Sequence, residues 1–321
     1  MIVKHRKVPL KIRKLEALLR RLPPAHPKRM EVERELARRL SGYKGEQSLD
    51  YYLSFLPEQE FFILHDIRLT EKDYYFQLDT LILSPSFSLI LEAKNLSGTL
   101  IFDQNFHQLI RIINEKEEVF PDPVQQVKHQ QFQFARWLKN NHFPSMPLES
   151  LVVITYPNAL VKTSPSNIPL LSVIRTPSLL DKINALKEIH KEEVITPKEI
   201  PKLCKLLVKH HTPGNPDILQ QFGINESELL TGVQCPQCAT LPMERKWGKW
   251  VCFNCSHSSK DAHLQALNDY YLLFQSIITN KKLRNFLQIS SSMVANKILT
   301  SMKIPFSGDK KARKYYLPFD D

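Results

Sequence analysis

The chain has 321 residues, 42% of them hydrophobic and 24% charged, which is the composition of a globular protein with about two domains. No apolar run approaches the length of a membrane span, and the charged N-terminus lacks the uninterrupted apolar region of a signal peptide. Four of the five cysteines lie in two CxxC pairs, which indicates metal ligands in a reducing compartment. We therefore expect a cytoplasmic protein without a membrane partner.

The net charge of +11 is concentrated at the two ends of the chain. Residues 1–45 contain 14 lysines and arginines against 4 glutamates, and residues 281–321 contain 9 against 3 aspartates. Basic ends around a mildly acidic centre are typical of segments that bind a polyanion. This pattern favours nucleic acid over a merely solubilising surface, and over a membrane surface because the N-terminus has no large apolar helix face.

The N-terminal third is predicted to be helical. Residues 9–40 show two helical patterns separated by prolines, and we interpret residues 1–41 as a basic helical arm. A third helix is predicted over 42–55, with Glu46 in its first turn. There Glu46 either complements the helix N-terminus or points toward the core edge.

The stretch from Phe76 to Asn95 predicts two strands joined at Ser84-Pro85-Ser86. Side chains alternate along a strand, so Glu92 and Lys94 share one face. If the strands pair across the turn, Asp79 falls opposite Glu92, within one residue. Two carboxylates facing each other on a buried sheet repel, and a divalent cation between them would turn that repulsion into a binding site.

The elements around this hairpin predict an α/β core. Strands are expected at 61–68, 98–106, 109–114, 151–155 and 171–175. Helices are expected at 123–141, with Gln125 near its start, and at 178–189 and 197–210. We assign residues 42–212 to this domain and 213–232 to a linker.

Asp79 and Glu92 suit a hard cation, Mg²⁺ or Mn²⁺, which would polarise a phosphate and acidify a bound water. Lys94 could orient or deprotonate that water and stabilise developing charge. The structural alternative is an ion pair of Lys94 with Asp79 or Glu92 at a sheet edge.

Residues from about Gly42 to Asn141 resemble the nuclease-related domain (NERD), a branch of the PD-(D/E)xK nuclease superfamily. The matching residues are Gly45-Glu46, Gln77-Leu78-Asp79, Glu92-Ala93-Lys94-Asn95, Gly98, Pro123 and Gln125. The resemblance implies a restriction-endonuclease-like mixed sheet flanked by helices, and Mg²⁺-dependent DNA cleavage. It carries over Asp79, Glu92 and Lys94 as catalytic residues, with Glu46 and Gln125 in support. Leu78 stands where the motif that names the superfamily has proline.

Residues 233–258 predict a small metal module. Two CxxC pairs separated by 13 residues supply four thiolates for a tetrahedral Zn²⁺, with rubredoxin-type iron as the rival metal. The ligands are Cys235, Cys238, Cys252 and Cys255. The segment resembles a zinc ribbon and is too short to fold without its metal. Its tryptophans, Trp247 and Trp250, either stack on nucleic acid or cover the zinc knuckles.

Residues 262–321 predict short helices followed by a turn and a basic strand, similar to a winged helix-turn-helix. The alternative is a helical domain that binds protein. Across this segment and the zinc ribbon we expect nucleic acid to contact the following residues: Lys246, Lys249, Ser292, Asn296, Lys297, Lys310, Lys311, Arg313 and Lys314.

The sequence thus favours a metal-dependent nuclease that acts on duplex DNA, with structural zinc. The alternatives are a non-catalytic DNA-binding protein that keeps a nuclease-like fold, and a scaffold whose C-terminal modules bind protein. The intact acidic pair with Lys94 favours the enzyme, and the charge distribution favours nucleic acid.

Overall fold

A computed structural model describes residues 1–164, 170–196 and 198–318. The chain divides into two compact units, one of residues 1–8 with 39–214 and one of residues 9–38 with 215–321. The described residues contain no helix that is both long enough and apolar enough to cross a membrane.

The first unit is mixed α/β. Its strands are β1 (Ile2–Lys4), β2 (Phe62–Glu71), β3 (Tyr74–Leu83), β4 (Ser88–Lys94), β5 (Thr99–Asp103), β6 (Gln108–Ile113), β7 (Lys116–Pro121), β8 (Leu148–Ile154), β9 (Leu160–Ser164) and β10 (Val173–Arg175). Its helices are the C-terminal part of α2 (Arg29–Leu53), then α3 (Pro123–Asn140), α4 (Leu179–Ile189) and α5 (Ile200–His210), with a 3-10 turn at Thr176–Ser178. The sequence analysis missed β7 and β9, which are short and largely exposed.

Two sheets, both mixed, organise this unit. The larger has six strands in the order β1-β2-β3-β4-β8-β10, and the smaller has four in the order β7-β6-β5-β9. In the larger sheet β2, β3 and β4 are antiparallel, whereas β8 runs parallel to β4 and β10 runs parallel to β8. Strand β4 therefore sits between an antiparallel and a parallel neighbour, in the middle of the sheet.

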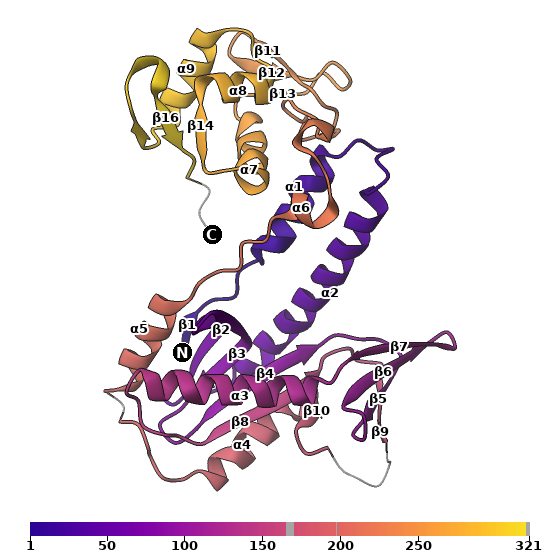
Figure 1. Ribbon diagram of the computed structural model, residues 1–321, viewed down its shortest axis with the longest axis vertical. Coiled ribbons are helices and arrows are strands. Elements are labelled where there is room, and N and C mark those ends of the chain that lie inside the picture. The colour runs from indigo at the N-terminus through magenta and orange to yellow at the C-terminus, as the bar shows by residue number, and fades with distance from the viewer. Residues whose placement is uncertain (165–169, 197, 319–321) are drawn as a thin grey trace. The chain divides into compact units, whose positions relative to one another are not determined.

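Helices cover both faces of the six-stranded sheet, and Figure 1 shows α3 crossing in front of its strands. Ile90 packs with α3 and α5 on one side, whereas Leu89 and Leu91 pack with α2 and α4 on the other. This alternation is the one predicted for β4, and it places Glu92 and Lys94 on the α3 side. The predicted fold class, a mixed sheet flanked by helices, is confirmed.

Helix α2 runs without a break over 25 residues, where the sequence suggested two helices divided near Gly42. Glycine weakens a helix interior by about 1 kcal/mol, so two glycines three residues apart imitate a helix boundary. The helix nevertheless continues through Gly42 and Gly45 because its C-terminal half packs on the sheet through Leu49 and Leu53.

The second unit contains α1 (Leu10–Arg21), the start of α2, α6 (Ile218–Phe222), α7 (His263–Leu273), α8 (Asn280–Leu287) and α9 (Ser292–Ser301). Its strands are β11 (Glu244–Lys246), β12 (Lys249–Val251), β13 (Ser258–Ser259), β14 (Ile277–Thr279), β15 (Phe306–Ser307) and β16 (Lys314–Tyr316), with 3-10 turns at Glu226–Glu228 and Lys310–Ala312. The strands form two three-stranded sheets, β11-β12-β13 and β14-β16-β15.

Helix α1 belongs to the second unit through a buried ion pair. Arg21 Nε donates to Asp269 Oδ2 of α7 over 2.8 Å, and its Nη1 donates to the Gly232 carbonyl over 2.7 Å. Both charged side chains are fully buried. The N-terminal residues 9–38 thus pack as part of a folded unit.

The cysteine-containing sheet and the C-terminal helices share one hydrophobic core. Cys252 and Trp250 pack in the same cluster as Leu267 of α7, Leu283 of α8 and Leu299 of α9. The Trp250 indole also donates from Nε1 to His263 Nδ1 over 3.1 Å. The two C-terminal segments that the sequence separated are therefore packed together.

Candidate active site and metal centre

Strands β3 and β4 bring Asp79 and Glu92 to neighbouring positions at the end of their pairing. The last paired residues are Thr80 and Leu91, and Asp79 and Glu92 are the next residues of the two strands. The Ala93 amide donates to Asp79 Oδ2 over 3.3 Å, which ties the aspartate to the end of β4.

Helix α3 encloses Glu92 and Lys94 with two glutamines on one face. Lys94 Nζ lies 2.6 Å from Glu92 Oε1 and donates to Gln126 Oε1 over 3.1 Å. Gln130 Nε2 donates to Glu92 Oε2 over 3.1 Å and to the Gln77 carbonyl over 3.0 Å. The Lys94–Glu92 ion pair of the structural alternative is therefore present.

One buried oxygen at this site has no partner. The amide of Gln130 uses its nitrogen on Glu92, which leaves Gln130 Oε1 buried without a hydrogen bond in the described part of the chain. A buried unsatisfied oxygen costs about 1–3 kcal/mol. The unpaired oxygen belongs to the side chain that holds Glu92, and amide and carboxylate oxygens are the kind of donor that Mg²⁺ or Mn²⁺ takes.

The carboxyl groups of the site disfavour one another's charge. Burial raises the pKa of Asp79 well above its usual range, and the charges of Glu92 and Glu46 raise it further. Burial raises the pKa of Glu46 to about 7 against the opposing effect of Arg6. A site that concentrates buried negative charge is one that a divalent cation would stabilise.

Gly45 lets helix α2 approach the ends of the strands. A Cβ atom at Gly45 would lie 2.5 Å from Asn95 Cβ and 2.7 Å from Thr155 Oγ1, which is closer than atoms can approach. Asn95 Nδ2 also donates to the Ser41 carbonyl of the same helix over 2.8 Å. This close packing brings Glu46, the next residue, toward Asp79 and Glu92.

Arg6 is a residue of this region that the sequence analysis missed. Strand β1 adds the N-terminus to the sheet parallel to β2, and the Arg6 side chain behind it is only 4% exposed. Its guanidinium lies 2.7 Å from Glu46 Oε2, 3.2 Å from Asp50 Oδ1 and 2.8 Å from His65 Nδ1. Burial and the neighbouring cations lower the pKa of His65 to about 3, so its neutral ring can accept the bond from Arg6.

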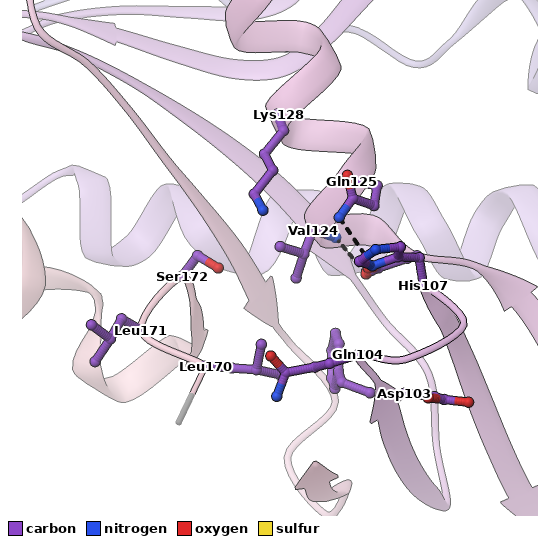
Figure 2. Close-up of a pocket in the computed structure, with 11 residues that line it drawn as sticks. Asp103, Gln104, His107, Val124, Gln125, Lys128, Leu170, Leu171 and Ser172 are labelled. Atoms are coloured by element: carbon purple, nitrogen blue, oxygen red, sulfur yellow. Dashed lines mark hydrogen bonds and ion pairs between the residues drawn. The ribbon is translucent and has the colours of Figure 1, made fainter. Parts of the chain in front are cut away.

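Gln125 does not reach the carboxylates. Figure 2 shows it bonded to His107, with Gln125 Nε2 3.1 Å from His107 Nδ1. Both line a separate pocket of about 320 Å³. Successive residues of a helix point about 100° apart, so Gln126 and Gln130, one turn apart, share the face toward Glu92 and Gln125 does not. The described residues thus show Gln125 in contact with His107, and they show no hydrogen bond from Gln125 to Asp79 or Glu92 that would support the role implied for it.

The four predicted cysteines form one group. The ligand atoms of Cys235, Cys238, Cys252 and Cys255 all lie within 4.8 Å of one another, and no other group of three or more metal-binding side chains meets this condition in the described residues. The two CxxC segments have the same backbone hydrogen bond. The amide of the residue after the second cysteine donates to the carbonyl of the first cysteine over 3.0 Å, from Ala239 to Cys235 and from Ser256 to Cys252. Four sulfurs so arranged are consistent with a structural zinc site.

Replacing Cys252 with serine is expected to reduce the zinc content from about one ion per chain to near zero, because a site with three thiolates holds zinc weakly. Without the metal, Trp250 is expected to become exposed to solvent. Elemental analysis and tryptophan fluorescence measure both effects. Cys204→Ala is the matched control, because Cys204 is buried in α5 of the first unit. Zinc retained at the wild-type level in Cys252→Ser would exclude this ligand set.

The two tryptophans of the cysteine-containing sheet have different environments. Trp250 is 1% exposed and packs in the core, whereas Trp247, at the tip of the β11–β12 hairpin, is 99% exposed. Of the two alternatives left open by the sequence, covering the metal site therefore applies to Trp250 alone. Lys249 is exposed, and Lys246 pairs with Glu244 over 2.8 Å.

The remaining predicted nucleic-acid contacts lie in two places. Ser292, Asn296, Lys310 and Arg313 line one groove, described below, whereas Lys297 and Lys314 are exposed outside its lining. The side chain of Lys311 lies outside the described residues.

Comparisons with known proteins give one match, to a family model. No curated protein and no solved structure matches the chain significantly. Residues 41–155 match the family model NERD, described as the nuclease-related domain, and this segment carries Glu46, Asp79, Glu92 and Lys94. The match indicates a nuclease-related function with a nucleic-acid partner for this part of the protein.

Proposed function

We propose that the first unit is a metal-dependent nuclease that hydrolyses phosphodiester bonds of DNA at Asp79, Glu92 and Lys94. The observation that carries the proposal is the pair of neighbouring carboxyl groups on β3 and β4, Asp79 and Glu92, with Lys94 beside Glu92, inside the segment that matches the nuclease-related domain. The buried unpaired oxygen of Gln130 supports a cation at the same place.

In this proposal Asp79 and Glu92 would hold Mg²⁺ or Mn²⁺, and the cation would polarise the phosphate and lower the pKa of a water. Gln130 orients Glu92 through its amide, and Gln126 restrains Lys94. The ammonium of Lys94 would orient the attacking water and stabilise charge on the phosphate oxygens. Arg6 holds Glu46 at the edge of the site.

The rival function is DNA binding without cleavage, and the Lys94–Glu92 ion pair is the observation that favours it. Incubating the purified chain with plasmid DNA in Mg²⁺, Mn²⁺ or Ca²⁺ separates the two. We expect nicking or linearisation with Mg²⁺ or Mn²⁺ and little with Ca²⁺, which accepts looser geometry than the reaction requires. Retention of DNA without cleavage in any of these ions would favour the rival.

A further inference from the structure

A polar groove of about 640 Å³ lies in the second unit. Its walls are the first turn of α8, one face of α9, and the loop between β15 and β16. These elements occur in the order α7-β14-α8-α9-β15-β16, and the three strands form one antiparallel sheet. The groove is therefore built from three segments that one small sheet holds together.

Four cations line this groove: Lys281, Arg284, Lys310 and Arg313. No acidic residue contributes to the lining, and within the part of the chain that the structure describes no ion pair links these cations to a carboxylate. Arg284 instead donates to the side-chain oxygen of Asn280 over 3.1 Å and to the Ser290 carbonyl over 3.2 Å. Neutral partners fix the side chain without cancelling its charge, which stays available to an anionic ligand.

The uncharged part of the wall is a hydrogen-bonded network centred on Asn280. Its Nδ2 donates to Asn296 Oδ1 over 2.7 Å and to the Ser292 carbonyl over 3.0 Å, and Ser292 Oγ donates back to Asn280 Oδ1 over 3.2 Å. The network joins α8 to α9 and includes Ser292 and Asn296, two side chains of α9 that the sequence analysis expected to contact nucleic acid. Met293, Lys297 and Ser301 are the exposed residues of α9 that lie outside the groove.

We propose that this groove holds the phosphodiester backbone of duplex nucleic acid, with Lys281, Arg284, Lys310 and Arg313 as the phosphate contacts. Its volume is roughly twenty times the ~30 Å³ that one water occupies, so it admits a stretch of backbone and not one small anion alone. Arginine, lysine and neutral amide or hydroxyl groups are the side chains that contact phosphates, and such contacts carry no sequence information. The proposal does not depend on cleavage by the first unit.

The test is the salt dependence of duplex binding by the full chain, measured by fluorescence anisotropy without added Mg²⁺. The double variant Lys281→Gln with Lys310→Gln is expected to bind more weakly and to lower the slope of log affinity against log salt by roughly 2, about one per phosphate contact. Lys260→Gln with Lys303→Gln removes the same charge from exposed positions of the second unit outside the groove and is expected to keep the wild-type slope. Unchanged zinc content in both variants verifies that the second unit is folded.

Two duplexes of unrelated sequence should lose the same affinity in the groove variant, because the contacts are to phosphates. A wild-type slope in the groove variant would overturn the proposal. So would an equal or larger decrease in the control variant, since the affinity would then follow the net charge of the second unit and not the groove. Loss for only one of the two sequences would likewise overturn it, in favour of base contacts.

Discussion

The variant Asp79→Asn is expected to lose metal-dependent DNA cleavage by on the order of 10³-fold while the protein becomes no less stable. The substitution keeps the shape of the side chain and removes its charge, and with it the pairing of two carboxylates on which the proposed metal site depends. Initial rates with Mg²⁺ and the free energy of unfolding measure the two effects on the same preparation.

The stability half of this prediction follows from the electrostatics of the site. The pKa of Asp79 is raised in the folded protein by burial and by Glu92 and Glu46, so its ionised form is disfavoured relative to the unfolded chain. For a carboxyl with a raised pKa, ionisation near neutral pH costs folding free energy, and a neutral isostere removes that cost. A purely structural aspartate would behave in the opposite way, with stability reduced and cleavage unaffected.

Asp73→Asn is the matched control for Asp79→Asn. Asp73 lies in the turn between β2 and β3 and is exposed, so the same chemical change there should alter neither quantity. Equal cleavage by Asp79→Asn and Asp73→Asn would remove Asp79 from the proposed site.

Replacing Arg6 with alanine is expected to destabilise the first unit by about 3 kcal/mol, because it leaves the buried His65 and the half-buried Glu46 and Asp50 without their shared cation. Arg6 contacts Glu46, Asp50 and His65 at once, and its side chain is almost fully buried. Hydrogen exchange of the β2, β3 and β4 amides measures this loss within the first unit alone.

Arg6→Lys distinguishes a general loss of packing from a role of Arg6 in the site. Lysine keeps the charge but cannot reach three partners with one planar group, so it should recover part of the stability. Lys44→Ala, an exposed change in the same helix as Glu46, should have little effect. If the β2, β3 and β4 amides were as well protected from hydrogen exchange in Arg6→Ala as in Lys44→Ala, the N-terminal segment would not stabilise this part of the sheet.

The features that the sequence predicted well are those that local chemistry determines. The two-residue period of β4 assigned Glu92 and Lys94 to one face, and the Ser84-Pro85-Ser86 turn predicted the pairing of β3 with β4, which runs as far as Thr80 and Leu91. The cysteine spacing likewise predicted the four-sulfur group, because two CxxC pairs have few other uses in a short segment.

The features that it missed depend on contacts between distant parts of the chain. Strand β1 has three residues and pairs with a strand about sixty positions later. A segment this short has no periodic pattern from which Arg6 could be predicted as a neighbour of Glu46. The choice of Gln126 and Gln130 over Gln125 depends on the rotation of α3 about its axis, which its packing on the sheet decides. The polar groove of the second unit likewise depends on α8, α9 and the β15–β16 loop, which lie far enough apart in the sequence that no local pattern brings them together.

The most direct test of the central claim is a comparison of Mg²⁺-dependent plasmid cleavage by the wild-type chain and by Asp79→Asn, at equal zinc content and equal stability. We predict cleavage by the wild type and a rate lower by on the order of 10³-fold in the variant. Cleavage at the same rate in both, or no cleavage by the wild type in Mg²⁺ or Mn²⁺, would contradict it.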